Sequence, residues 1–375
     1  MTRRLTCMRV SVGACLLLVV SVTPVLAAQA PPGLAAITTR VEAEAQRLLA
    51  ETGTPAVSIA LIRSGVVVWA QAFGFANVAT RVAATPDTYF STGSTFKLVT
   101  ATAVMQLVET GRVSLDTPLN ALVDSAPAID GADDVTLRHL LSHHSGLTGP
   151  FDFVPLWSRK TLMSPEQILA ATRREGPPGT EHRYCNECYA IASYVIERIS
   201  GVPYDQYVAE RVLRPLGIDI SLATIPTPAM VERMALPYDV ENGVSTPIEQ
   251  VRFDVYAAGD AYLRPMDMAK LFAAHLGGGS YAGQRILKES SMIEMHRQQF
   301  ESGRNGLGID LAQLNGRAVI QHNGLIPGFN SIMIGDPETG HGVYVMANSG
   351  NSGRAVASLA RLSLRLLWGE EPGAP

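Results

Sequence analysis

The chain has 375 residues, of which 47% are hydrophobic and 17% charged, and its formal net charge is −4. This length and apolar fraction allow a globular protein with a large core and two lobes. The acidic balance excludes a nucleic-acid partner, because binding to phosphates requires a basic surface.

Residues 1–30 have the pattern of a secretory signal peptide. Three arginines precede an apolar run from Val10 to about Leu26, and small residues follow it. The run is shorter than the roughly 20 residues of a spanning helix, so we favour export over a membrane anchor. We expect a periplasmic or secreted protein with no stable membrane span after leader removal. Loss of the three arginines would change its formal charge from −4 to −7.

The mature chain begins with a predicted helix and a hairpin. Alanine and leucine spacing over 32–52 fits an amphipathic helix. The β-rich runs 56–63 and 66–75 follow and are separated by Ser64-Gly65, which is typical of a hairpin turn.

Helical patterns dominate the middle of the chain, and strand patterns return near its end. Predicted helices cover 96–109, 136–142, 165–174, 189–200, 204–212 and 266–275, predicted strands 307–314, 318–321, 330–334 and 343–347, and a last apolar helix 356–368.

The order of these patterns predicts an α+β fold of the α/β-sandwich type. Segments 31–85 and 279–375 would form one antiparallel sheet lobe flanked by helices, and 86–278 an inserted, mainly helical lobe. We expect the two lobes to act as one catalytic unit, with the ligand in the cleft between them.

Ser94 and Lys97 lie three residues apart at the expected start of a helix, which places hydroxyl and amine on one face. Serine attacks acyl carbon poorly unless a neighbour takes its proton, and a lysine can do so only if burial or positive charge lowers its pKa. The chain has only four lysines and otherwise carries arginine, which cannot deprotonate. We interpret the pair as nucleophile and base; the alternative is an ordinary surface serine and lysine.

Two further motifs supply polar groups. Tyr184 and Asn186 lie on a loop before a predicted helix; tyrosine can shuttle a proton, and asparagine can bind a substrate amide. His322-Asn323-Gly324 follows a predicted strand, where glycine allows close backbone approach and a following N–H can face an oxyanion. Taken singly, the tyrosine could merely pack the helix start and the histidine could be a surface residue.

Cys185 and Cys188 are the only cysteines after leader removal. The pair lacks the second pair that a four-cysteine zinc site needs. We favour two separate buried side chains over a local disulfide formed after export. No metal site is expected elsewhere, because His139 and His143 are not part of an HExxH motif.

In this order, the three motifs resemble those of the serine β-lactamase and penicillin-recognising DD-peptidase superfamily, closest to its class C-like branch. Other segments across most of the mature chain are also similar to it. They are 89–94 (YFSTGS), 111–118 (GRVSLDTP), 137–147 (LRHLLSHHSGL), 178–180 (PGT) and 214–217 (RPLG).

The resemblance implies a β-lactamase/transpeptidase-like fold and a role for each matching residue. Ser94 would form the acyl-enzyme, Lys97 would deprotonate it, and Tyr184 would relay a proton to the leaving group. Asn186 would hold the substrate amide, and the backbone N–H groups of Ser94 and Leu325 would form the oxyanion hole.

Some residues depart from the class C pattern. His322 stands where class C β-lactamases usually carry lysine, which favours a DD-peptidase or esterase over efficient β-lactam hydrolysis. Asn323, beside Gly324, replaces a common threonine or serine, and Cys185 replaces alanine or serine; both change the pocket wall.

We therefore expect a secreted serine hydrolase that needs no cofactor and acts on D-Ala-D-Ala-like amides or small esters, with a small-molecule or peptide substrate. The alternatives are a class C-like β-lactamase and a non-hydrolytic, penicillin-binding-like sensor. An α/β-hydrolase is disfavoured because no GxSxG elbow is present.

Overall fold

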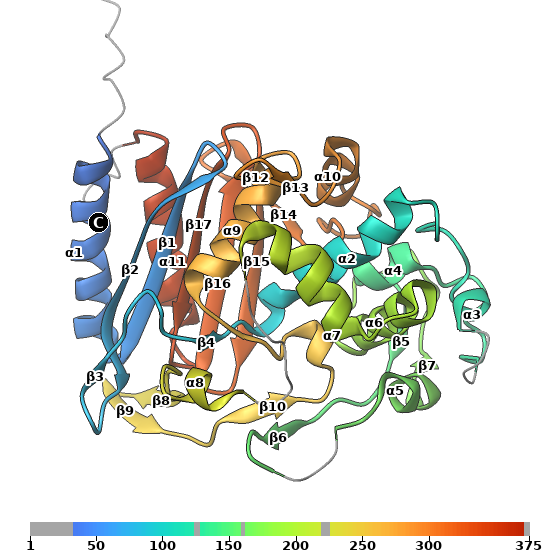
Figure 1. Ribbon diagram of the computed structural model, residues 1–375, viewed down its shortest axis with the longest axis horizontal. Coiled ribbons are helices and arrows are strands. Elements are labelled where there is room, and N and C mark those ends of the chain that lie inside the picture. The colour runs from blue at the N-terminus through green and yellow to red at the C-terminus, as the bar shows by residue number, and fades with distance from the viewer. Residues whose placement is uncertain (1–32, 124–127, 159–161, 219–225, 371–375) are drawn as a thin grey trace, which may run out of the picture. The chain divides into compact units, whose positions relative to one another are not determined.

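A computed structural model describes residues 33–123, 128–158, 162–218 and 226–370 (Figure 1). The predicted signal peptide, 1–30, lies outside the described residues. The described helices and strands confirm the α+β fold with a large antiparallel sheet.

The sheet has seven strands in the order β14-β15-β16-β17-β1-β2-β3, so strands from both ends of the chain meet in its middle. Strand β1 pairs antiparallel with β17, with Val57 opposite Ala347, and with β2, with Val57 opposite Phe73. The bounds are β14 Asp310–Leu314, β15 Arg317–Ile326, β16 Phe329–Asp336, β17 His341–Ala347, β1 Ala56–Arg63, β2 Val66–Asn77 and β3 Val82–Ala83.

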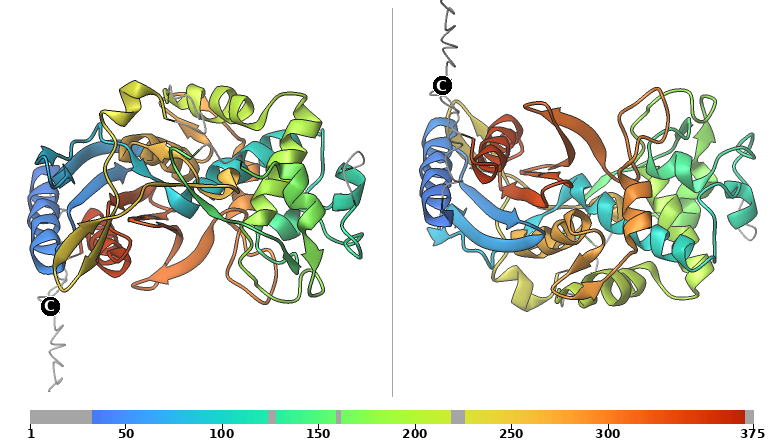
Figure 2. Two further views of the ribbon diagram at one scale, coloured as in Figure 1. Left: turned by 90° about the horizontal axis from the view of Figure 1, so that it is seen from below. Right: turned by 90° about the horizontal axis from the view of Figure 1, so that it is seen from above.

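Helices cover both faces of this sheet. Helices α1 (Leu34–Thr52) and α11 (Gly353–Leu367) pack together on one face (Figure 2), where they bury alternate residues of β1 such as Ile59. The intervening residues of β1, including Ala60, face the opposite core, where helix α9 (Pro265–Leu276) packs. Because successive side chains of a strand point to opposite faces and both faces of β1 are covered, six of its eight residues are apolar and seven are buried.

The helical part of the chain is built around α2 (Lys97–Glu109), which is buried over most of its length. Most residues of α2 are apolar or small, so the helix can be buried on all sides. Helix α6 packs against α2, and α4 and α5 pack against α6 (Figure 1). The helices of this region are α3 Leu119–Leu122, α4 Leu137–Leu141, α5 Pro165–Ala171, α6 Glu187–Ser200, α7 Tyr204–Tyr207 and α8 Pro228–Val231.

The remaining elements are short. They are β4 Phe90–Ser91, β5 Leu147–Thr148, β6 Phe153–Pro155, β7 Arg173–Arg174, β8 Tyr238–Glu241, β9 Val244–Pro247, β10 Val251–Phe253, β11 Tyr262–Leu263, β12 Ser280–Tyr281, β13 Gln284–Arg285, helix α10 Glu289–His296, the 3₁₀ helices Gly93–Phe96, Arg214–Leu216 and Tyr256–Ala258, and the π-helix Val208–Leu213.

The structure differs from the sequence pattern at several elements. Helix α9 lies in the range assigned to the helical lobe, yet it packs on β17, β1 and β2. The predicted helix 204–212 becomes the single turn α7 followed by a π-helix, and helix α10 was not predicted. The packing of α9 depends on strands far away in sequence, which periodicity does not report.

Candidate active site

Ser94 and Lys97 lie where a 3₁₀ turn, Gly93–Phe96, runs directly into α2. The turn and the helix share right-handed backbone conformation, because Phe96 and Lys97 both have helical dihedral angles. Residues three apart on a helix face the same side. The Lys97 ammonium Nζ consequently lies 3.1 Å from Ser94 Oγ and donates to it.

Lys97 is fully buried, and three oxygens satisfy its amine. Besides Ser94 Oγ, Nζ donates to Asn186 Oδ1 at 2.7 Å and to the Ala258 carbonyl at 2.9 Å. Burial lowers the pKa of Lys97 well below its ordinary value, and the carboxylate of Glu187 only partly opposes this. A lysine in such a setting can be neutral and can accept the proton of the adjacent serine.

Tyr184 approaches Ser94 from the loop before α6. The Ser94 side chain is close enough to act on the pKa of the phenol, and Lys97 Nζ lies 4.8 Å from its ring centroid. Loss of solvent around the phenol raises the pKa of Tyr184, even though 47% of the residue's surface stays accessible. The phenol therefore stays protonated and can act as a proton donor beside the nucleophile.

His322 lies inside strand β15, where it pairs with Met333 of β16. The prediction of a strand end here was wrong, because pairing with β16 continues to Ile326. The side chain is buried, its ring centroid lies 6.4 Å from that of Tyr184, and Nδ1 donates to the Asn323 carbonyl at 2.7 Å. Burial lowers the pKa of His322, and Asp310 opposes this shift.

Strand β15 runs close against the backbone of the nucleophile turn. A Cβ added to Gly324 would lie 2.3 Å from the Thr92 carbonyl oxygen and 3.2 Å from Ser94 N, and one on Gly93 would lie 2.8 Å from Leu325 N. The amides of Ser94 and Leu325 are therefore neighbours, as an oxyanion hole requires. The contact is held in place by Ser331, whose hydroxyl donates to the Thr92 carbonyl at 2.6 Å.

Side chains alternate along β15. His322 and Gly324 are buried, whereas Asn323 and Leu325 are exposed. Asn323 therefore presents its amide to solvent on the opposite side of the strand from His322. Exposed Leu325 contributes an apolar side chain beside its own amide.

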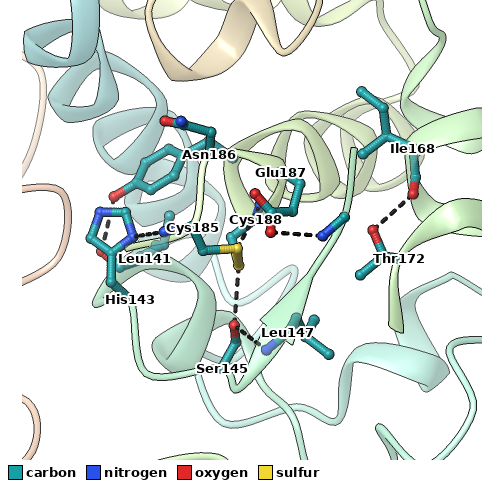
Figure 3. The surroundings of a disulfide bond; sticks show 12 residues. Leu141, His143, Ser145, Leu147, Ile168, Thr172, Cys185, Asn186, Glu187 and Cys188 are labelled. Carbon is teal, nitrogen blue, oxygen red and sulfur yellow. Dashed lines mark hydrogen bonds between the residues drawn. A yellow bond between two sulfur atoms is a disulfide. The ribbon is translucent and has the colours of Figure 1, made fainter. Parts of the chain in front are cut away.

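Cys185 and Cys188 form a disulfide at the base of the Tyr184 loop (Figure 3). The prediction of two unlinked side chains was wrong about the bond, although both residues are buried. The cause is the helix start: α6 begins at Glu187, and its first turn brings the two Cα atoms to 5.4 Å. Ser145 Oγ lies 3.1 Å from Cys188 Sγ.

Sequence reasoning missed three groups of the site. Lys97 binds the backbone carbonyl of Ala258, and the alanine side chain gives no sign of this role in the sequence. Glu187 is buried, and its Oε1 accepts from the Gly149 amide at 2.8 Å; burial raises the pKa of Glu187. His143 stacks on Tyr184 with 4.2 Å between ring centroids. His143 belongs to segment 137–147, whose sequence indicated only the family resemblance and a rejected metal site.

Within the described ranges, no three histidine, cysteine, aspartate or glutamate side chains form a group that could hold a metal ion. His139 Nδ1 instead accepts from the Thr136 amide at 3.1 Å, at the start of α4. Among the helices that the structure describes, none combines the length and hydropathy needed to cross a membrane.

Comparison with known proteins gives consistent matches. Residues 41–367 match the family model described as Beta-lactamase. Penicillin-binding protein 4 of Amycolatopsis lactamdurans is 31% identical over 234 residues, which cover 60% of this chain and 61% of that protein. The chain spans 58 to 64% of the lengths of the first curated relatives it matches.

Two solved structures are similar over most of the chain. D-amino acid amidase from Ochrobactrum anthropi SV3, complexed with L-phenylalanine, has a TM-score of 0.70 and 27% identity, covering 87% of this chain and 99% of that one. The octameric penicillin-binding protein homologue from Pyrococcus abyssi has a TM-score of 0.73 and 25% identity, covering 89% and 78%.

Proposed function

The chain belongs to the Beta-lactamase family, and from this premise we propose that it is an exported serine hydrolase that forms an acyl-enzyme at Ser94. We propose D-Ala-D-Ala-like amides or small esters as its substrates. The observation that carries the proposal is the position of the buried Lys97 amine, 3.1 Å from Ser94 Oγ. Burial lowers the pKa of this lysine, so it can take the serine proton. The similarity to a D-amino acid amidase and to penicillin-binding proteins supports amide substrates.

Acylation uses the groups around Ser94 in turn. Neutral Lys97 takes the hydroxyl proton as Ser94 Oγ attacks the substrate carbonyl carbon. The amides of Ser94 and Leu325 hold the resulting oxyanion. Tyr184 donates its proton to the departing nitrogen or oxygen as the bond to the acyl carbon breaks, and Lys97 returns a proton to Tyr184.

Deacylation follows the same path with water as the nucleophile. Water gives a proton to the base and its oxygen to the acyl carbon, the ester bond to Ser94 breaks, and the Ser94 oxygen recovers a proton. Asn186, which accepts from Lys97 at 2.7 Å, both orients this amine and offers its amide N–H groups to the substrate.

Two observations support export. The N-terminal sequence has an arginine-flanked apolar run followed by small residues. The Cys185–Cys188 disulfide suits an oxidising compartment, because cytosolic thiols are kept reduced.

The test is acylation and turnover by the mature protein, residues 31–375, with Ser94→Ala as control. We expect a fluorophosphonate to add one adduct by intact mass, at Ser94, and a D-Ala-D-Ala peptide or a p-nitrophenyl ester to be hydrolysed faster than nitrocefin. Faster turnover of nitrocefin would assign a β-lactamase instead. A stable penicillin adduct without turnover of any substrate would assign a sensor, and turnover that survives in Ser94→Ala would place the nucleophile elsewhere.

A further inference from the structure

We propose that His143 is a positioning residue of this site: it holds the Tyr184 phenol at Ser94 by binding the loop backbone on both sides of the tyrosine. The inference rests on the proposed function, because it assigns a role in the same reaction. Its physical basis is a set of contacts that all converge on one residue of the α4–β5 connection.

The amides on either side of Tyr184 both donate to His143. The Arg183 N–H donates to the His143 carbonyl at 2.8 Å, and the Cys185 N–H donates to the ring atom Nδ1 at 3.0 Å. The imidazole also stacks on the phenol ring, with centroids 4.2 Å apart and planes 26° apart. The backbone of both neighbours of Tyr184 and the ring of Tyr184 therefore all contact one residue, His143, through its carbonyl and its imidazole.

His143 is itself rigidly held. It follows α4 with φ of 62°, a left-handed conformation that turns the chain toward the Tyr184 loop. Its side chain is buried against Tyr189, with ring centroids 5.5 Å apart, and the Tyr189 hydroxyl donates to the Leu141 carbonyl at 2.9 Å. Figure 3 shows His143 on one side of Cys185 and the disulfide on the other. The loop is thus anchored from two directions.

The contacts require the neutral imidazole. Because Nδ1 accepts from Cys185, the ring proton is on Nε2, which is buried and makes no hydrogen bond within the described parts of the chain. Burial, and then the charges of Lys97 and His322, lower the pKa of His143 well below its usual range. A second proton would remove the acceptor and add positive charge beside Lys97.

The Tyr184 ring also lies near Lys97, whose Nζ is 4.8 Å from its centroid, and near His322, whose ring centroid is 6.4 Å away. Lys97 takes part in the proposed proton transfers, whereas His143 does not. A displacement of the phenol by about 1 Å can cost about 10²-fold in rate, so the loop's anchor should affect catalysis through Tyr184.

Two substitutions separate the acceptor from the stacking ring. His143→Phe keeps an aromatic ring but removes the acceptor, and we expect kcat for a D-Ala-D-Ala peptide to fall by about 10²-fold with KM within about 3-fold. His143→Asn tolerates the left-handed backbone and places an oxygen near the former Nδ1, so we expect it to recover most of that loss. His143→Gln, whose amide reaches past that position, is the control and should not.

The leaving group supplies a readout that a purely structural role would not give. A p-nitrophenolate leaves without a proton, whereas an amine needs one, so each His143 variant should lose more activity on the peptide than on the p-nitrophenyl ester. In a Tyr184→Phe background, His143→Phe should change kcat by less than about 3-fold, because the group it positions is gone. Equal losses on both substrates, or additive losses in the double variant, would overturn the proposal.

Folding and function are monitored separately. Thermal unfolding is measured for each variant; should His143→Phe not fold, the comparison of His143→Asn with His143→Gln gives the same answer. Wild-type protein that fluorophosphonate does not label and that hydrolyses neither substrate would overturn the proposed function and this inference together. Active wild type with unaffected His143 variants would overturn the inference alone.

Discussion

At the scale of single residues, the site depends on burial as much as on spacing. A serine and a lysine three residues apart are common, but Lys97 is fully enclosed, with oxygens of Ser94, Asn186 and Ala258 around its amine. Enclosure lowers the pKa of Lys97, whereas an exposed lysine would remain charged. The chemistry of the SxxK pair therefore follows from where α2 begins inside the protein.

Replacement of Lys97 by arginine tests the role of the neutral amine. Arginine stays positively charged and cannot take a proton, so we expect kcat/KM to fall by at least about 10²–10⁴-fold. The measurement is ester hydrolysis by purified Lys97→Arg. Lys270→Arg is the matched control, because Lys270 lies outside the site and its Nζ donates to the Gly217 carbonyl at 3.0 Å. Activity near wild type in Lys97→Arg would rule out Lys97 as the base.

Replacement of Gly324 by alanine tests the contact between β15 and the nucleophile turn. The added Cβ would lie 2.2 Å from Ser331 Oγ and 2.3 Å from the Thr92 carbonyl, so the strand must move away from Ser94. We expect kcat/KM to fall by about 10²–10³-fold, the typical cost of one oxyanion donor. Gly176→Ala, where an added Cβ meets nothing within 4 Å, should retain activity. An unaffected Gly324→Ala would argue against an oxyanion hole at this contact.

At the scale of elements, the loop before α6 is held from two directions next to Tyr184. The turn after α4 binds it through His143, and the Cys185–Cys188 disulfide joins it to the first turn of α6. A loop held this way can keep Tyr184 in place although the residue is 47% exposed. Helices α4 and α6 thus act as supports for the site.

Removal of the disulfide tests its contribution to stability. The sequence separation of 3 closes a very short loop, so the chain-entropy model gives a loss of about 2 kcal/mol for the variant with both Cys185→Ala and Cys188→Ala. Denaturant unfolding measures this difference. Wild type unfolded with a thiol reductant should match the variant, and the variant itself should not respond to reductant. If the oxidised wild type is no more stable than the variant, the disulfide contributes no stability.

At the scale of the whole described molecule, the sheet joins both ends of the chain, and one buried and one partly buried histidine lie together near its β14 edge. Helices α9 and α10 bring His275 and His296 together, with His275 Nδ1 3.1 Å from His296 Nε2 and Thr102 Oγ1 2.9 Å from His275 Nε2. Both residues line a cavity of about 460 Å³ beside β14 and β15. Ser94 is not among the residues that line this cavity.

Because of these histidines, we expect the free energy of unfolding to fall in acid. Burial lowers the pKa of His296 from 6.5 to about 4. Between these values the unfolded chain binds more protons than the folded protein, so the free energy of unfolding falls as the pH falls. His296→Gln should make this dependence shallower by at most about 1.4 kcal/mol per pH unit.

Denaturant unfolding between pH 7 and pH 4 checks this expectation. An identical pH dependence in His296→Gln and wild type would show that the His296 imidazole does not contribute.

The amino-acid sequence alone determined the parts that depend on neighbours along the chain. Periodicity gave α1, the β1–β2 hairpin, α2 and the C-terminal strands, because a few residues decide helix or strand. The Ser94 and Lys97 spacing is likewise local. The resemblance to the β-lactamase and DD-peptidase superfamily, carried by three motifs and confirmed by the family match, placed them in one fold.

Only the tertiary structure decided what these residues contact. Lys97 Nζ binds the Ala258 carbonyl and Asn186 Oδ1, which lie 161 and 89 residues away in the sequence. His143 binds the Cys185 amide of the Tyr184 loop, 42 residues away. The continuation of β15 past His322 depends on pairing with β16, and the disulfide depends on where α6 starts. Such contacts arise from chain packing in three dimensions, which no local pattern of residues encodes.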